Sequence, residues 1–478
     1  MKPRVVLVWG NFNIVHPGHM RLLRFAKAQG DELWVGVTSD RLGGNGVHIP
    51  EDLRLEGVAS NGFVDKAFIF DDDVQSMVRR LKPHALVKGK EHELAYNSEQ
   101  VALDEYGGEM LFSSGEALLS SADLLRRELL EITTNKVEID RKYLDRHKVD
   151  IGSLIKTIEK FSQVKACVVG DLIVDEYIIC DSLGMSQEDP SIVVTPIDSK
   201  RFVGGAGIVA SHGVGLGAGV DFVSVSGSDE AADFARQSLD RYSVRHLITA
   251  DSSRPTTVKQ RFRAAGTTLL RVSHLSQTPI SRQVQDEILD RVVKSMEDCQ
   301  LLVFSDFNHG CLPQRLVDEI ARSGKLKGIT MVADSQSSSQ IGDVGRFSDM
   351  DLLTPTEREA RIAMRNNQDG LVVLAEMLMD RTRSRGVLMK MGSEGLLVNT
   401  RLEGSDLMLT DELSALNKNP KDVAGAGDSL LMTSALAMAS GATIWESALL
   451  GTMAAAIQVS RVGNIPLQSS ELTSLLHG

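Results

Sequence analysis

The stretch from Asp422 to Asp428 (Asp-Val-Ala-Gly-Ala-Gly-Asp) has residue types and a spacing that suit phosphoryl transfer. A Gly-Ala-Gly turn that leads into an apolar helix leaves backbone N–H groups without partners, which favours an anion there. Gly425, Ala426 and Gly427 let a phosphate approach the backbone closely, and the helix dipole adds partial positive charge. Asp428 would repel this ligand unless it acts as a general base on an attacking hydroxyl. The alternative is that Asp428 is an ordinary helix cap.

Two histidines near the N-terminus form a second group that could handle phosphate. His16 and His19 lie in the loop that follows the apolar run from Val5 to Trp9. No cysteine or third histidine lies nearby in the sequence to complete a zinc site, and loop residues without a role are the other plain interpretation. Two imidazoles at the start of a helix can instead hydrogen-bond the phosphate oxygens that gain charge during nucleotidyl transfer.

Composition restricts the class of protein. With 478 residues, of which 42% are hydrophobic and 24% charged, the chain is long enough for two or three soluble domains. A net charge of −12 argues against nucleic acid as a partner, and no apolar run is long enough to span a membrane. The N-terminus enters a strand-like run rather than a signal peptide. Four cysteines without C-x-x-C spacing predict a reducing, cytoplasmic location: Cys167, Cys180, Cys299 and Cys311.

Hydrophobic periodicity predicts the elements that position the two histidines. A buried strand over 5–9, a helix with an apolar face over 22–26 and a second strand over 33–37 make a βαβ unit. Ligands of such units bind at the carboxyl ends of the strands, which is where the histidine loop begins. Residues 135–155 are crowded with charges and predict a solvated helical linker between domains over 1–134 and 156–478.

The C-terminal two-thirds predict a doubly wound α/β domain. Apolar strands recur between helical stretches, at 165–170, 220–225, 301–305, 329–334, 351–354 and 387–391. Two segments, 176–194 and 256–272, have strand character with polar residues facing out, and we expect them to form a lid that excludes water from phosphoryl transfer. The predicted fold class is therefore α/β, with two doubly wound parallel-sheet domains and a small β lid.

Residues 1–130 resemble the cytidylyltransferase-like nucleotidyltransferases, because His-x-Gly-His (residues 16–19) follows Gly-x-Phe (residues 10–12). The resemblance implies that His16 and His19 are catalytic. It further implies that the nucleotide is bound by Asn11, Phe12, Asp40, Arg54, Lys88, Ser120 and Ser121. The sequence departs from the family pattern at Asn13, where the family usually has Asp, and at Ala122, where it usually has Thr.

From about Ser162 onward the chain resembles the ribokinase-like carbohydrate kinases, on Gly170-Asp171 with Asp175, on Gly204-Gly205 and on Asp422 to Asp428. The resemblance implies that the sugar is held by Asp171, Asp175, Gly204, Gly205, Lys259 and Arg261, and the nucleotide by Lys390, Gly392, Glu394 and Gly395. By pattern it is most similar to the kinase half of the bifunctional heptose kinase/adenylyltransferases of lipopolysaccharide-core biosynthesis, on residues 184–190, 257–261 and 305–310. In that family the kinase comes first, whereas here the transferase comes first.

Several family positions around the substrates are replaced. Ile208 and Thr356 stand for asparagines, and His309 and Gln336 stand for lysines. These replacements indicate either a different, less anionic substrate or a weakened kinase.

The leading hypothesis is a bifunctional enzyme that makes a nucleotide-activated sugar. ATP would phosphorylate a sugar or sugar phosphate, with Asp428 as the base, and Mg²⁺ would bridge the ATP phosphates while Glu359 contacts it through water. The sugar 1-phosphate would then attack ATP or CTP in the other half. Two alternatives stay open: one half, more so the substituted kinase half, is a binding or regulatory module, or the transferase acts on a polyol phosphate. By resemblance, the expected assembly is a homodimer.

Overall fold

The structure, a computed structural model, contains two compact units, Met1–Asn135 (unit 1) and Lys136–Gly478 (unit 2). It describes residues 3–13, 15, 17–43, 47–89, 97–113, 141–186, 191–264, 267–337, 342–402, 404–405 and 407–477. None of the helices in these ranges combines the length and hydropathy that a membrane span requires.

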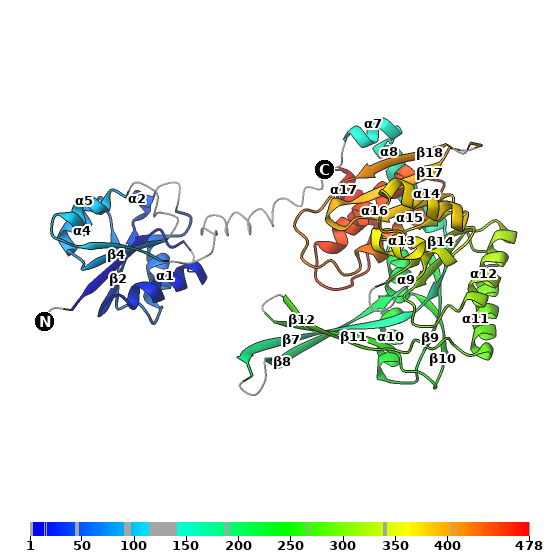
Figure 1. Ribbon diagram of the computed structural model, residues 1–478, viewed down its shortest axis with the longest axis horizontal. Helices are drawn as coiled ribbons and strands as arrows, with labels where there is room; N and C mark the ends of the chain where they lie inside the picture. Colours follow the sequence, from blue (N-terminus) through cyan, green and yellow to red (C-terminus); the bar gives the residue numbers. More distant parts are fainter. Residues whose placement is uncertain are drawn as a thin grey trace. The chain divides into compact units, whose positions relative to one another are not determined.

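Unit 1 is built on a five-stranded parallel sheet in the order β3-β2-β1-β4-β5 (Figure 1). Its elements are β1 Val5–Gly10, α1 Pro17–Lys27, β2 Glu32–Thr38, α2 Asp40–Gly43, α3 Glu51–Ala59, β3 Lys66–Phe70, α4 Val74–Leu81, β4 Ala85–Gly89, α5 Glu99–Asp104 and β5 Glu109–Ser113. Along β1, Val6 and Val8 pack with residues of α1 and α3, whereas Leu7 packs with residues of α4 and α5. Burial on both faces explains the unbroken apolar run, and the predicted doubly wound arrangement is confirmed.

Unit 2 contains a nine-stranded sheet in the order β10-β9-β6-β13-β14-β15-β16-β17-β18. Its strands are β6 Lys165–Gly170, β9 Gly219–Ser226, β10 Arg245–Ala250, β13 Leu301–Asp306, β14 Thr330–Ser335, β15 Leu352–Leu353, β16 Gly386–Lys390, β17 Leu396–Arg401 and β18 Met408–Leu413. The pairs from β10 to β16 are parallel. The sequence predicts this for the strands from β9 to β16, whereas it misses the parallel edge strand β10 and the antiparallel edge formed by β17 and β18.

Helices cover both faces of this sheet. They are α8 Ile151–Lys160, α9 Ala206–Gly215, α10 Glu230–Arg241, α11 Arg282–Ser295, α12 Gln314–Lys327, α13 Glu357–Met364, α14 Leu371–Thr382, α15 Ala426–Ala439, α16 Ile444–Val459 and α17 Ser469–His477. In β6, Val168 belongs to the core with α9, α15 and α16, and Val169 to the core with α11, α12 and α14. The alternation of side chains along one strand therefore serves two separate cores.

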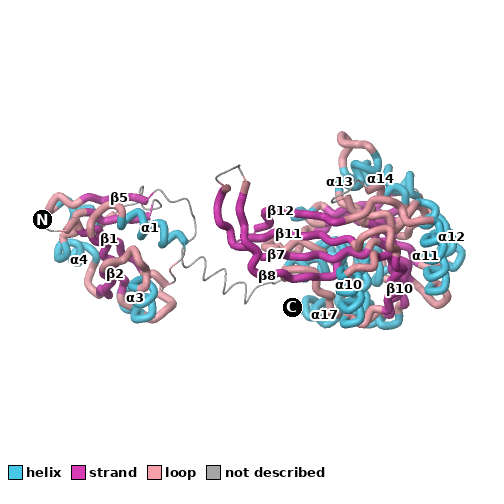
Figure 2. The backbone as a smooth tube through the Cα atoms, turned by 90° about the horizontal axis from the view of Figure 1, so that it is seen from below, coloured by secondary structure: helices cyan, strands magenta, loops and turns pink. Residues whose placement is uncertain are grey.

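A separate four-stranded sheet forms the lid, in the order β12-β11-β7-β8 (Figure 2). Its strands are β7 Leu172–Met185, β8 Ile192–Gly205, β11 Thr257–Ala264 and β12 Thr267–His274. The two segments predicted as a lid, 176–194 and 256–272, contain most of β7, β11 and β12, whereas most of β8 lies beyond them. Gly205 ends β8 with φ of 59°, and a Cβ there would lie 2.4 Å from the carbonyl oxygen of Asp171, so the turn into α9 requires glycine.

The described part of the predicted linker (135–155) packs on unit 2 instead of being solvated. Helix α7, Arg141–His147, places Tyr143 in the core of unit 2, where its Oη donates to the carbonyl oxygen of Trp445 at 3.0 Å. The ring of His147 stacks on Trp445 with the centroids 3.9 Å apart, and Arg146 Nε pairs with Asp411 at 2.8 Å. The high charge content of this segment predicts a solvated helix, and it does not reveal that Tyr143 is buried.

Candidate active sites

Asp428 lies in the first turn of α15, and the turn before that helix has the geometry an anion site requires. The N-terminal residue that caps the helix is Gly425, with φ of 78°, and a Cβ there would lie 2.4 Å from Asn464 Oδ1. The alternative that Asp428 is the cap is therefore wrong. The first N–H groups of a helix have no intrahelical partners, so the turn through Gly427 presents donors.

Buried charges surround Asp428. Burial, followed by the nearby carboxylate of Asp334, raises the pKa of Asp428 to about 7, although Lys390 opposes the shift. Gln336 Nε2 donates to Asp428 Oδ1 at 3.0 Å. A carboxylate whose pKa lies near neutrality can accept a proton under ordinary conditions.

Lys390 ends β16 and lies against the anion turn. Its Nζ is 2.9 Å and 3.0 Å from the two carboxylate oxygens of Asp334, and a Cβ on Gly427 would lie 3.3 Å from it. Burial works to lower the pKa of Lys390, but Asp334 and Glu359 raise it above its ordinary value, so the ammonium stays charged. A cation in this position suits the charge of a transferring phosphoryl group.

The other predicted nucleotide-binding residues lie in the turn between β16 and β17. Gly392 and Glu394 are exposed there, and Gly395 has φ of 109°. A Cβ on Gly395 would lie 2.0 Å from the carbonyl oxygen of Leu413, so this position requires glycine. The turn directly follows Lys390 and thus lies at the same end of β16.

Glu359, the predicted metal residue, is already engaged by backbone donors. Its oxygens accept from the N–H groups of Ser337 at 2.9 Å and Thr356 at 2.7 Å, and Thr356 caps α13. Within the described ranges no three acidic, histidine or cysteine side chains are placed to hold a metal ion. The described residues therefore build no metal cage of their own, and Glu359 would contact a Mg²⁺ ion through water.

Asp171 holds the loop that follows β13. It is buried and accepts from the backbone N–H groups of Phe307, His309 and Cys311 at 2.8, 3.3 and 3.1 Å. Burial, followed by the neighbouring carboxylate of Asp306, raises the pKa of Asp171 to about 6. The structure therefore gives Asp171 a positioning task beside the predicted sugar contact.

Asp175 joins several distant segments at one point. Asn464 Nδ2 donates to its Oδ2 at 3.1 Å, and Arg261 Nη2 is 3.5 Å from its Oδ1. A Cβ on Gly204 would lie 2.2 Å from Asp175 Oδ2, which explains why glycine stands there. Burial raises the pKa of Asp175, and Arg261 opposes that shift.

The lid brings its cations over the site. Lys259 Nζ, on β11, lies 5.1 Å from the ring centroid of Phe307. Burial lowers the pKa of Lys259, while the carboxylates of Asp175 and Asp428 raise it. On the neighbouring strand, Tyr177 Oη donates to Asp422 Oδ2 at 2.8 Å and so ties the lid to the start of the anion loop.

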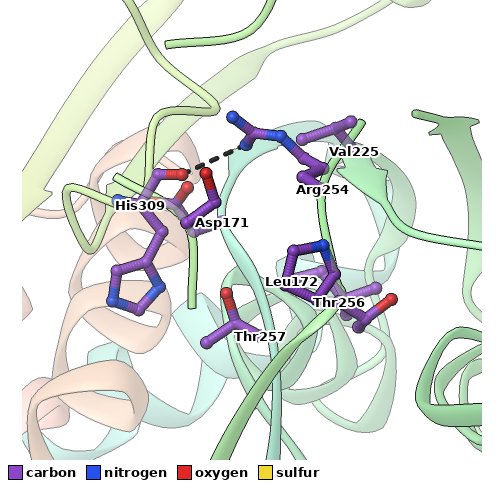
Figure 3. A pocket seen from close by; sticks show the side chains of 9 residues that line it. Asp171, Leu172, Val225, Arg254, Thr256, Thr257 and His309 are labelled. Atoms are coloured by element: carbon purple, nitrogen blue, oxygen red, sulfur yellow. Dashed lines mark hydrogen bonds between the residues drawn. The ribbon is translucent and has the colours of Figure 1, made fainter. Parts of the chain in front are cut away.

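The four replaced family positions have different fates. Ile208 is fully buried in α9, Gln336 contacts Asp428, and Thr356 caps α13. His309 lines a small pocket whose other side carries Arg254, and the guanidinium of Arg254 donates to the carbonyl oxygen of His309 at 3.1 Å (Figure 3).

In unit 1, Arg54, the arginine predicted to face phosphate, is buried and hydrogen-bonded within the protein. The side chain of Arg54 is 0% exposed, and its guanidinium donates to the carbonyl oxygens of Ile49 at 2.7 Å and Asn11 at 2.6 Å. It also pairs with Asp40 Oδ1 at 2.7 Å. Arg54 thus fixes the loops after β1 and β2, while Thr38 Oγ1 donates to Asn11 Oδ1 at 2.6 Å.

The other predicted site residues of unit 1 that the structure describes also contact side chains of the protein. Lys88 Nζ is 2.9 Å from Glu99 Oε1, which accepts from Trp9 Nε1 at 3.0 Å. Phe12 is buried with φ of 49°, and its ring centroid is 5.0 Å from that of His19. His16, Ser120 and Ser121 lie outside the described residues.

Sequence reasoning missed several residues of the unit 2 site. Asn464 bonds Asp175 across 289 positions of sequence, and no local pattern marks it. Asp334 does end a predicted buried strand, which is a usable signal for a residue at a sheet edge. Tyr177, on β7 of the lid, donates to Asp422 across 245 positions of sequence, and no local pattern marks it.

Together, the doubly wound sheet, the β lid and the buried aspartate at a helix N-terminus define unit 2 as an α/β fold of the phosphotransferase kind. Comparison with known families makes this specific. The pfkB family carbohydrate kinase model matches residues 163–470, and the chain belongs to that family. The cytidylyltransferase-like model matches residues 7–106, in the unit that precedes it.

Curated relatives and solved structures are also similar to this chain. The bifunctional protein HldE of Paramagnetospirillum magneticum is 29% identical over 332 residues, 69% of this chain and 66% of the relative, and that of Nitrobacter hamburgensis is 31% identical over 320 residues, 65% and 63%. The chain thus spans slightly less than two thirds of these curated relatives. Arabidopsis thaliana ribokinase (18% identity, TM-score 0.51) and Escherichia coli phosphofructokinase-2 (14%, 0.53) share the fold, each over 66% of this chain and 99% and 98% of their own.

Proposed function

We propose that this chain is a bifunctional transferase that makes a nucleotide-activated sugar. Unit 2 would phosphorylate a sugar or sugar phosphate with ATP, and unit 1 would transfer a nucleotidyl group from ATP or CTP to the sugar 1-phosphate. The single observation that carries the kinase assignment is Asp428, buried with its pKa raised to about 7, beside a helix N-terminus and Lys390. The similarity to proteins named as bifunctional supports a second activity.

In unit 2 the chain's own residues perform the proton and charge handling. Asp428 accepts the proton of the acceptor hydroxyl, and Gln336 fixes the orientation of its carboxylate. The N–H groups of the turn from Gly425 to Gly427, together with Lys390, stabilise charge on the transferring group. Mg²⁺ bound to the ATP phosphates supplies further neutralisation of that charge. The lid, which carries Asp175 and Lys259, keeps water out.

The acceptor class follows from the motifs at residues 184–190, 257–261 and 305–310, which favour a heptose phosphate of the kind used in lipopolysaccharide-core synthesis. In unit 1, His16 and His19 stabilise the charge that develops on the α-phosphate when the sugar 1-phosphate attacks. No protein nucleophile is needed in either step. The reaction is expected to take place in the cytoplasm.

Phosphorus NMR tests the kinase assignment. Wild-type protein, ATP and Mg²⁺ are incubated with D-ribose, D-fructose 6-phosphate, D-mannose and a D-heptose 7-phosphate, and the spectra are followed for ADP and a new sugar-phosphate signal. We expect transfer to at least one acceptor and its loss in Asp428→Asn. If Asp428→Asn phosphorylates at the wild-type rate, the assignment is wrong.

A second candidate function is that unit 1 binds nucleotide or sugar without turnover. The observation that favours it is the engagement of Arg54 and Lys88 by acceptors of the protein itself. Calorimetry would decide: nucleotide binding to the full chain without pyrophosphate release from any sugar 1-phosphate, in a protein whose kinase is blocked by Asp428→Asn, would support the binding module.

We also propose a homodimer that forms through the lid. The two edge strands of the lid, β8 and β12, each expose large apolar side chains: Ile192, Val193, Ile197, Leu269 and Leu270. Sedimentation should give a dimer that Ile197→Glu dissociates, and a monomeric wild-type protein would contradict this proposal.

A further inference from the structure

His309 is held rigidly at the carboxyl end of β13. The carboxylate of Asp171 accepts from the backbone N–H groups of Phe307 at 2.8 Å, Cys311 at 3.1 Å and His309 itself at 3.3 Å. Arg254 donates to its carbonyl oxygen at 3.1 Å, and Ile280 N donates to the carbonyl oxygen of Gly310 at 3.1 Å. The backbone that carries the imidazole is therefore fixed before any ligand arrives.

The imidazole itself has no hydrogen-bond partner in the part of the chain that the structure describes. The residue is only 3% exposed, yet neither Nδ1 nor Nε2 is bonded. A buried polar group without a partner is costly, and native proteins rarely leave two such atoms on one ring. An orphaned ring on a rigid loop therefore points to a ligand that completes it.

The ring is neutral and lies beside the phosphoryl-transfer site. Burial, and then the charges of Lys259 and Arg254, lower the pKa of His309 to about 3. The ring centroid of His309 is 6.3 Å from that of Phe307. Lys259 Nζ lies over the Phe307 ring, and it is close enough to Asp428 for that carboxylate to raise its pKa. Together with Asp171 and Thr257, His309 lines the pocket of Figure 3.

We propose that His309 is a specificity-determining residue that hydrogen-bonds an uncharged hydroxyl group of the phosphoryl acceptor. This inference rests on the proposed kinase function. A neutral imidazole offers one N–H donor and one lone pair, which a hydroxyl group matches in both directions. A phosphate group only accepts, and the lysine that the resemblance places here would match it as a cation. The replacement therefore moves this part of the acceptor site from an anion toward a polyol.

The test compares acceptors that differ by one hydroxyl group. The probes are the panel sugar that the wild type phosphorylates and its monodeoxy analogues. His309→Phe removes both ring nitrogens at similar shape, and we expect it to raise the acceptor KM about tenfold with kcat nearly unchanged. With one deoxy analogue this difference between wild type and variant should vanish. His309→Gln, which keeps a donor and an acceptor, should recover much of the affinity, and an unchanged KM for ATP shows that both variants fold.

An equal KM increase for every analogue, or none for any, overturns the inference while the kinase assignment stands. If the wild type phosphorylates no member of the panel, the proposed function fails and this inference fails with it.

Discussion

The two units differ in where the cations predicted to bind phosphate lie. In unit 1, Arg54 and Lys88 occupy the positions that the family resemblance assigns to phosphate, but both are engaged by acceptors of the protein. In unit 2, Lys390 is also paired, with Asp334, but it lies against the anion turn and shares one buried site with Lys259 and Asp428. This arrangement is present although four neighbouring family positions are replaced. Agreement with a motif therefore does not predict which site is already arranged for chemistry. Among the described residues, those of unit 2 bring a buried base and two cations together, although it is the half with the replaced family positions.

The largest expected effect is the loss of kinase activity in unit 2. Asp428→Asn keeps the shape but cannot accept the proton, so kcat for sugar phosphorylation should fall by about 10²- to 10⁴-fold. ADP release measures it. Asp290→Asn, on the exposed face of α11, is the matched control and should behave as wild type. A variant that keeps more than about a tenth of the activity would exclude Asp428 as the base.

The next effect concerns stability in unit 1. Arg54→Met leaves Asp40 and two carbonyl oxygens without their donor, so we expect a loss of about 2–3 kcal/mol in the free energy of unfolding. Denaturant titration followed by Trp9 and Trp34 fluorescence, in a Trp445→Phe background, reports it. Exposed Arg24→Met is the control. Equal stability of the two variants would show that the hydrogen bonds of Arg54 do not stabilise unit 1. The difference drawn here between the cations of the two units would then disappear.

A smaller effect is expected at Gln336. Gln336→Leu removes the donor to Asp428 Oδ1 and should lower kcat/KM of the kinase about three- to tenfold. The ATP KM should not change, since the contact is with the base. Initial rates at saturating Mg²⁺ measure it, and an unchanged kcat/KM would mean that the carboxylate is oriented without this hydrogen bond.

The smallest effect moves the pH profile. Because the pKa of Asp428 is raised to about 7, the carboxyl group is protonated and inactive at lower pH, and kcat/KM should rise with pH to a plateau above about 7. Asp334 contributes to the raised value, so Asp334→Asn should lower the pKa of Asp428 and shift the rise to lower pH. A rise that stays in place, or shifts to higher pH, would contradict this electrostatic account.

Much of the fold could be predicted because it depends on local patterns. The unbroken apolar runs of β1 and β6 predict buried parallel strands, and two segments that break the predicted strand–helix alternation contribute to the lid. The edge strands β17 and β18 were missed, since an antiparallel hairpin interrupts the strand–helix alternation without changing composition. The packing of α7 was missed because Tyr143 is one residue among many charges.

The site was less predictable, for a physical reason. The glycines at 204, 205 and 425 could be identified because backbone geometry restricts them. Whether a cation faces a ligand or an internal acceptor depends on partners far along the chain, as with Arg54 and Asn11, 43 positions apart. The pairing of Asn464 with Asp175 is likewise invisible without the folded chain.

The most direct test of two independent active sites is a crossover experiment by phosphorus NMR on the full chain. Wild type, Asp428→Asn and the double variant His16→Ala, His19→Ala are each given the kinase acceptor with ATP, and separately a sugar 1-phosphate with ATP or CTP. The account predicts that Asp428→Asn loses only phosphorylation of the acceptor, and that the histidine variant loses only pyrophosphate release. Loss of both reactions in either variant, or of neither, would contradict it.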